Sequence, residues 1–117
     1  MIRQLGNGML VSIDGKDLIG TENFHSTFQE VFGFPDFYGR NMNAWNDCMS
    51  SLDEASDGLT TLHVAQGQFV TLYITNVNVL RQLGRSEYEA LIECAAFVNY
   101  RRVEIGLLPI IALSFYA

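Results

Sequence analysis

The side chains best suited to chemistry lie close together in the sequence, between residues 34 and 52. They include an adjacent acid and thiol, Asp47 and Cys48, a pairing that suggests a nucleophile with its base. In a helix, however, neighbouring side chains point about 100° apart, and a nearby carboxylate raises rather than lowers the pKa of a thiol. We therefore expect no catalytic role for this pair.

A stiff turn and one amphipathic helix are expected to position these residues. Pro35 fixes its own φ and favours an extended residue before it, and Gly39 can adopt a φ that bulky residues avoid. From about residue 41 the apolar residues recur at steps of three and four, as on one face of an α-helix. That face holds Met42, Trp45, Met49 and Leu52, and we expect Trp45 to pack in the core. The opposite face, which we interpret as the working surface, holds Asn43, Asn46, Asp47 and Ser50.

The rest of the sequence shows no pattern of an enzyme, a cofactor site or a metal site. It has no nucleophile elbow, phosphate-binding loop or His-Glu-x-x-His motif. We expect His25 at the surface or half-buried and His63 facing solvent. Cys48 and Cys94 lack a Cys-x-x-Cys spacing and are expected to be reduced, buried thiols. The sequence thus predicts a protein that is not an enzyme and that binds no cofactor or metal.

The charge balance argues against nucleic acid as a direct ligand. The 117 residues have a formal net charge of −6 and a single lysine, Lys16. Nucleic-acid binding relies on basic patches that release counterions from phosphate, whereas an acidic chain is steered towards basic partners. The sequence lacks a signal-peptide pattern and any apolar run near the ~18 residues of a membrane span. We expect a soluble, cytoplasmic protein with no membrane partner.

Alternating strand and helix signals predict a single α/β domain over residues 1–117. The expected strands are 9–14, 59–65, 69–75 and 109–115, and the expected helices are 21–32, 41–52, 79–83 and 86–100. The strand at 69–75 is almost entirely apolar or β-branched, which suits burial on both faces of a sheet. The strand at 59–65 is expected to pair with it as an edge strand, and the residues before Met9 are expected to be flexible coil.

The last predicted helix has recognisable signals at both ends. Ser86-x-x-Glu89 matches a capping box at its start. Arg101 and Arg102 lie at its end, where cations interact favourably with the helix dipole. We prefer this structural role for the two arginines over ligand binding.

The run from Pro35 to Cys48, PDFYGRNMNAWNDC, resembles the signature of the barstar family, intracellular inhibitors of small secreted bacterial ribonucleases of the barnase type. In that family a Pro-acidic-aromatic-Tyr-Gly-x-Asn turn leads into an acidic helix that carries an Asp-Cys pair. All these features are present here at matching spacing. The resemblance implies a small three-stranded parallel sheet with helices packed on it. Residues 53–68 look like an insertion relative to the family, which leaves room for one added antiparallel strand.

The resemblance also implies an inhibitor of the antitoxin or immunity type that blocks the basic active site of a small ribonuclease. In such a complex a helix-borne aspartate stands in for a phosphate group and accepts charge-assisted hydrogen bonds from Arg or Lys. Asp47 matches the family's inhibitory aspartate, and Phe37 falls where the family has a tyrosine that packs on the enzyme. The candidate partner-binding residues are Phe37, Tyr38, Gly39, Asn41, Asn43, Asn46, Asp47 and Ser50.

Two of these positions depart from the family pattern. Asn43 falls where barstar carries an acidic contact residue, and Asn46 falls where it carries an exposed tryptophan. The family also uses a glutamate late in the last helix, a region that holds Arg101 and Glu104 here. An alternative is therefore a non-inhibitory protein-interaction or regulatory module that reuses the fold. For the inhibitor, we expect a monomer whose partner is a basic small ribonuclease or a related toxin.

Overall fold

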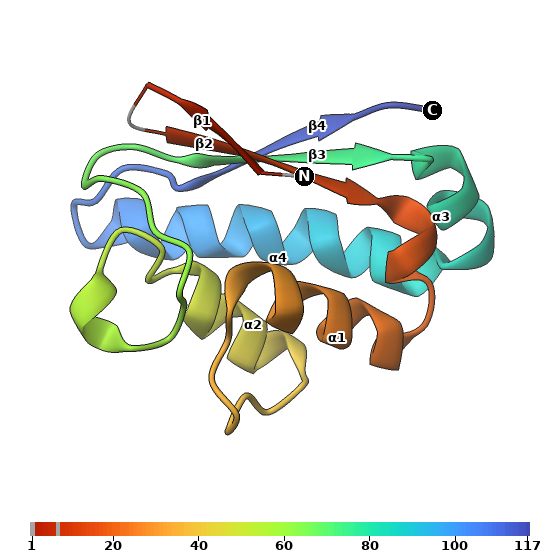
Figure 1. The fold of residues 1–117 in the computed structure, drawn as a ribbon, viewed down its shortest axis with the longest axis horizontal. Coiled ribbons are helices and arrows are strands. Elements are labelled where there is room, and N and C mark those ends of the chain that lie inside the picture. The colour runs from red at the N-terminus through yellow and green to blue at the C-terminus, as the bar shows by residue number, and fades with distance from the viewer. Residues whose placement is uncertain (1, 7) are drawn as a thin grey trace.

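A computed structural model describes residues 2–6 and 8–117 and shows an α/β architecture (Figure 1). Its strands are β1 (Ile2–Leu5), β2 (Gly8–Asp14), β3 (Val70–Thr75) and β4 (Ile111–Phe115). Its α-helices are α1 (Thr21–Phe32), α2 (Met42–Met49), α3 (Val77–Leu83) and α4 (Arg85–Glu104). Two short 3₁₀ helices, η1 (Gly15–Leu18) and η2 (Ala55–Asp57), follow β2 and α2.

The four strands form one sheet in the order β1-β2-β3-β4. β2, β3 and β4 run parallel, with Val11 opposite Leu72 and Leu72 opposite Leu113. β1 runs antiparallel to β2 and places Ile2 opposite Val11. The predicted parallel sheet with an added antiparallel strand is therefore confirmed. The added strand comes from the N-terminus, however, so the expectation of coil before Met9 is wrong for residues 2–5.

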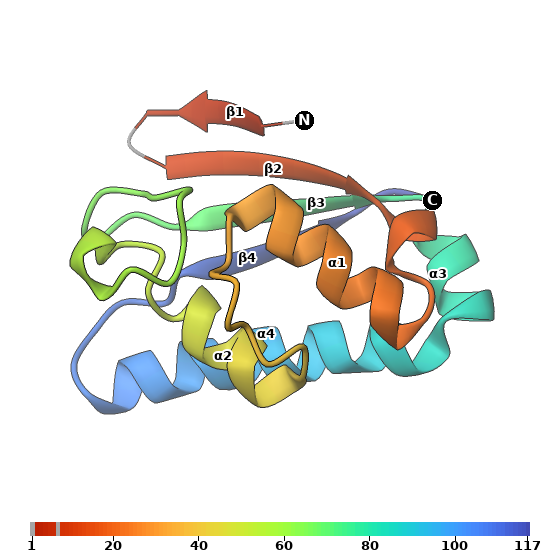
Figure 2. The ribbon, with the colours of Figure 1, turned by 60° about the horizontal axis from the view of Figure 1, so that its bottom comes forward.

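The helices pack on one side of the sheet (Figures 1 and 2). As a result, buried and half-buried side chains alternate strictly along β3. Val70, Leu72 and Ile74 are buried, whereas the residues between them are only half-buried. The expectation that this strand is buried on both faces is wrong, because the helices cover a single face.

An aromatic cluster in the core joins α1 to α2. Trp45 of α2 is fully buried and lies against Phe24 and Phe28 of α1, with ring centroids 6.3 and 5.5 Å away. Large aromatic side chains bury much apolar area and have preferred packing geometries. The prediction that Trp45 packs in the core is confirmed. This packing fixes which side of α2 can face solvent.

Residues 59–65 are irregular rather than a strand, which corrects the prediction of an edge strand there. The N–H of Leu62 donates to the carbonyl of Phe32, and the N–H of Val64 donates to the carbonyl of Leu52. The side chains of Leu62 and Val64 are buried. The apolar residues of this segment therefore cover the core beside the ends of α1 and α2 instead of extending the sheet.

The start of α4 also differs from the prediction. The helix begins at Arg85, so Ser86 lies inside it, and the Ser86 hydroxyl donates to Glu87 rather than to a backbone amide. Glu89 forms an ion pair with Arg85 one turn earlier. The predicted capping box is therefore absent. In the part of the chain that the structure describes, no helix is long and apolar enough to span a membrane.

Candidate partner-binding surface

The turn between α1 and α2 is held in place by side chains of α1. Gln29 donates from Nε2 to the carbonyl of Pro35, and Arg40 donates from Nη1 to Oε1 of Gln29. Nη2 of Arg40 donates to the hydroxyl of Ser26 over 2.7 Å. Arg40 has a φ of 53°, a left-handed conformation that is uncommon for a residue other than glycine. Such strain persists only where the surrounding contacts impose it, as these hydrogen bonds do.

The left-handed φ predicted for Gly39 therefore occurs at Arg40 instead. A Cβ at Gly39 would lie 3.2 Å from Nδ2 of Asn41, a tight contact that the Asn41 side chain would have to relieve by a small shift. Asn41 is the N-cap of α2. Its side-chain oxygen accepts from the N–H of Ala44 over 2.8 Å, a bond that satisfies one of the free amides at the helix start.

Phe37 lies on this turn, and its side chain is 77% exposed. An exposed aromatic ring on a rigid segment loses little conformational entropy on binding and is typical of an interface anchor. Its placement suits the contact role predicted from the sequence.

Tyr38, by contrast, is buried beneath the turn. Its ring packs against Phe34, and its hydroxyl is hydrogen-bonded to Nδ1 of His25, which is also buried. The expectation of a surface or half-buried His25 is wrong, because the turn folds back over α1 and covers it. Burial raises the pKa of Tyr38, and burial together with the nearby charge of Arg40 lowers the pKa of His25. Tyr38 therefore shapes the turn from below. His63 is half-buried, next to the Thr60 hydroxyl, rather than freely exposed.

His25 is expected to make the folded state less stable as the pH falls below neutral. In the unfolded chain it titrates near 6.5, whereas the folded pKa is lower. Between these two values only the unfolded chain takes up the proton, so the free energy of unfolding decreases as the pH decreases. Urea unfolding at pH values from about 7.5 to 5.5 should show this slope, and His25→Gln should reduce it. Equal slopes for the two proteins would contradict the prediction.

α2 carries two exposed polar side chains on one face. Asn43 and Asp47 are four residues apart, a spacing that places them next to each other along a helix. Asp47 is the only carboxylate in this helix, and its side chain is 65% exposed. The helix ends at Met49, earlier than the predicted Leu52, so Asp47 lies in its last turn.

Asp47 forms an ion pair with α4 that the sequence did not suggest. Nη2 of Arg101 lies 3.2 Å from Oδ1 of Asp47 and also donates to the Ser50 hydroxyl over 3.3 Å. Both side chains of the ion pair are substantially exposed, and such pairs typically contribute only about 0–1 kcal/mol. Asp47 is therefore oriented by Arg101 but remains available to a partner that offers stronger hydrogen bonds.

Asn46 does not lie on the exposed face, which corrects the prediction from the helical pattern. It is 5% exposed, and it lies close enough to Cys94 of α4 to offset part of the rise that burial causes in the pKa of that thiol. Its Oδ1 has no hydrogen-bond partner among the described residues. The spacing of apolar residues predicts a single buried side for this helix, but α2 packs against α4 as well as against α1. Asn46 cannot contact a partner while this packing persists.

The thiols do not provide a nucleophile. Cys48 is buried, and burial together with the neighbouring Asp47 carboxylate raises its pKa to about 11, so the thiol is protonated at neutral pH. Cys94 is half-buried, and burial raises its pKa as well. Within residues 2–6 and 8–117, no group of three or more His, Cys, Asp or Glu side chains could hold a metal ion.

The predicted residues thus divide into two sets. The exposed set, which we call the α2 surface, consists of Phe37, Gly39, Asn41, Asn43 and Asp47, with the half-buried Ser50 beside it. Tyr38 and Asn46 are buried and support this surface from below.

Sequence reasoning missed the tertiary contacts of three arginines that organise the surface. Arg40 fixes the turn and Arg101 pairs with Asp47. Arg102 is buried. It donates to the carbonyls of Ser50 and Leu108 and to Oδ2 of Asp53, and each of these three hydrogen bonds is 2.8 Å long. No local pattern reveals these contacts, because most of the partners lie on other elements of the fold.

The chain is similar to known proteins over most of its length. The family model described as "Barstar (barnase inhibitor)" matches residues 8–106, a range that contains the turn, α2 and almost all of α4. A protein of Bacillus subtilis (strain 168) named "Putative ribonuclease inhibitor YrdF" is 40% identical over 40 residues. That alignment covers 34% of this chain and 44% of the relative, so the chain spans less than half the length of the curated relative it matches.

Proposed function

The chain belongs to the barstar family, a family of inhibitors rather than enzymes, and from this we propose that it inhibits a small ribonuclease of the barnase type. In the proposed complex the α2 surface covers the basic active site of the ribonuclease, and the Asp47 carboxylate takes the place of a substrate phosphate. An inhibitor of this kind acts as an antitoxin or immunity protein. We place it in the cytoplasm as a monomer.

The exposed Asp47 in the last turn of α2 is the observation that carries this proposal. A carboxylate can accept two or more charge-assisted hydrogen bonds from the Arg and Lys side chains of a phosphate-binding site. The turn next to α2 presents Phe37 in a fixed position, which reduces the entropy lost on binding. The surface therefore combines an acidic group and an apolar anchor on one rigid support.

The neighbours of Asp47 restrict which ribonuclease fits. Asn43 is neutral, and Arg101 adds a positive charge at the edge of the surface. A partner built to meet several carboxylates would leave its own cations unpaired here. We therefore propose a ribonuclease whose active-site cations converge on a single carboxylate.

A titration of ribonuclease activity tests the proposal. We expect the cleavage of RNA by a barnase-type ribonuclease to fall linearly with added protein and to end at a 1:1 ratio. The measurement uses a panel of such ribonucleases, with a ribonuclease of unrelated fold as the control. Unchanged cleavage by every barnase-type member of the panel would contradict the proposed function.

A non-inhibitory interaction module is the second candidate. The ion pair between Asp47 and Arg101 favours it, because this pair neutralises the only carboxylate of α2 in the free protein. The same titration separates the two candidates, since such a module binds its partner without blocking RNA cleavage.

A further inference from the structure

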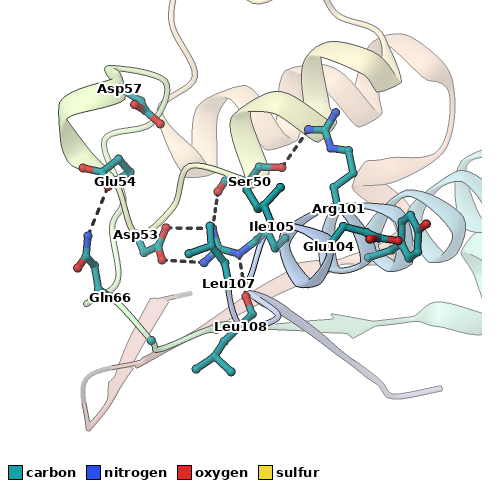
Figure 3. A pocket seen from close by; sticks show the side chains of 14 residues that line it. Ser50, Asp53, Glu54, Asp57, Gln66, Arg101, Glu104, Ile105, Leu107 and Leu108 are labelled. Carbon is teal, nitrogen blue, oxygen red and sulfur yellow. Dashed lines mark hydrogen bonds and ion pairs between the residues drawn. The ribbon is translucent and has the colours of Figure 1, made fainter.

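A pocket lies beside the α2 surface, where the end of α4 meets the segment that follows α2 (Figure 3). Its volume is about 790 Å³, within the range of pockets that hold ligands in proteins. One wall is formed by residues between 53 and 67, and the other by residues between 104 and 108. The first wall belongs to the segment that looked like an insertion relative to the family.

The wall at the end of α4 is apolar and open to solvent. Ile105, Leu107 and Leu108 line the pocket and are 75, 46 and 60% exposed. A single exposed apolar residue needs no explanation, but three of them in four positions, all in one concave site, indicate a surface that is covered by a partner.

Three carboxylates surround this apolar wall without a basic partner. None of the ion pairs among the described residues includes Glu54, Asp57 or Glu104. Glu54 and Asp57 accept hydrogen bonds from neutral groups, which orient the carboxylates but leave their charge uncompensated. The fourth carboxylate in the lining, Asp53, is paired with Arg102. The pocket therefore has an acidic rim.

The two walls are fixed to each other before any partner binds. Arg102 donates to the carbonyl of Leu108 in one wall and to Asp53 in the other. A preformed pocket avoids the entropy cost of ordering on binding.

The pocket and the α2 surface also share a border. Ser50 and Arg101 line the pocket, and Arg101 forms the ion pair with Asp47. A partner that covers Asp47 therefore lies next to the pocket, so one molecule can occupy both.

We propose that this pocket is a second docking site for the ribonuclease, occupied by a segment outside its active site that carries an Arg or Lys flanked by apolar side chains. The cation complements the three uncompensated carboxylates, and the apolar flanks cover Ile105 and Leu107. This inference rests on the proposed function. A second copy of this chain fits the acidic pocket less well, because the net charge of the chain is −6.

Charge reversal with a matched control tests the docking site. Glu54→Lys/Asp57→Lys reverses two charges of the rim, and Asp17→Lys/Glu30→Lys reverses two exposed carboxylates of η1 and α1 that form no ion pair among the described residues. Both pairs change the net charge equally, so long-range steering changes similarly and a difference between the two variants reports on the pocket itself. We expect the Kd of the rim variant for the inhibited ribonuclease to exceed that of the control at least about tenfold, mainly through faster dissociation. Ile105→Ser, which leaves the charge unchanged, should also weaken binding.

The outcomes are distinguishable. Rim and control variants that bind equally tightly, while the parent protein inhibits the ribonuclease, would overturn the docking site and leave the proposed function standing. A parent protein that inhibits no ribonuclease of the panel overturns both. A concentration-dependent dimer of the free protein, lost in Ile105→Ser, would assign the pocket to a second copy and overturn the inference.

Discussion

Asp47→Ala is expected to weaken inhibition of the ribonuclease between about 30-fold and several thousand-fold. Removing one partner of a buried, hydrogen-bonded charge pair at an interface typically costs about 2–5 kcal/mol. Binding breaks the exposed ion pair between Asp47 and Arg101, which contributes at most about 1 kcal/mol. The hydrogen bonds that Asp47 forms with the ribonuclease therefore stabilise the complex by more than the lost ion pair costs. The inhibition constant of the variant, measured against the same ribonuclease as the parent, checks this expectation.

Two controls separate the contact from a general charge effect. Asp17→Ala removes one exposed negative charge from η1 and should leave the inhibition constant nearly unchanged. Arg101→Ala frees Asp47 from its internal partner and should tighten binding by up to about fivefold. Inhibition by Asp47→Ala that equals that of the parent would show that a different surface binds the ribonuclease.

Arg102→Ala is expected to lower the free energy of unfolding by about 3–5 kcal/mol, the usual cost of removing one partner from a buried ion pair. The side chains of Arg102 and Asp53 are only 6% and 11% exposed. The substitution leaves the Asp53 carboxylate unpaired and takes a donor from the carbonyls of Ser50 and Leu108. Because domains of this size are stable by only about 5–15 kcal/mol, the loss should be easily measured by urea unfolding.

The neighbouring arginine provides the matched control for this prediction. Arg101→Ala removes an exposed ion pair from the same helix and should cost no more than about 1 kcal/mol. The double variant Asp53→Ala/Arg102→Ala should cost less than the sum of its single variants, because the two side chains share one interaction. Similar small losses for Arg101→Ala and Arg102→Ala would disprove the structural role of the buried pair.

The elements that the sequence predicted well are those with a local signal. The regular spacing of apolar residues located α1 and placed Trp45 in the core, and β-branched runs located β2, β3 and β4. Two signals misled. Residues 59–65 favour a strand by composition but hydrogen-bond to residues at the ends of α1 and α2 instead of to a strand, and residues 2–5 have no strong pattern but pair with β2. In both cases tertiary contacts determine whether the segment forms a strand, and the strand propensity of the residues does not reflect those contacts.

The same limit applies to the candidate site. The motif of the turn and α2 predicted which residues come together, and Phe37, Asn43 and Asp47 are exposed there. It could not reveal that Asn46 is buried, because a helical pattern assumes a single packed side and α4 covers a second one. Nor could it reveal the partner of Asp47, since Arg101 lies 54 residues later in the chain.

The position of β1 has a consequence for how the molecule opens. β1 is an edge strand of four exposed residues, whereas β3 lies inside the sheet and is buried at alternate positions. Segments with few buried contacts separate from a fold at low free energy, and their amide protons exchange with solvent first. The α2 surface is supported by α1 and α4 and does not depend on this strand. Fraying of the N-terminal edge therefore leaves the α2 surface intact, so we expect a short-lived, partly open molecule to bind the proposed ribonuclease as well as the closed one does.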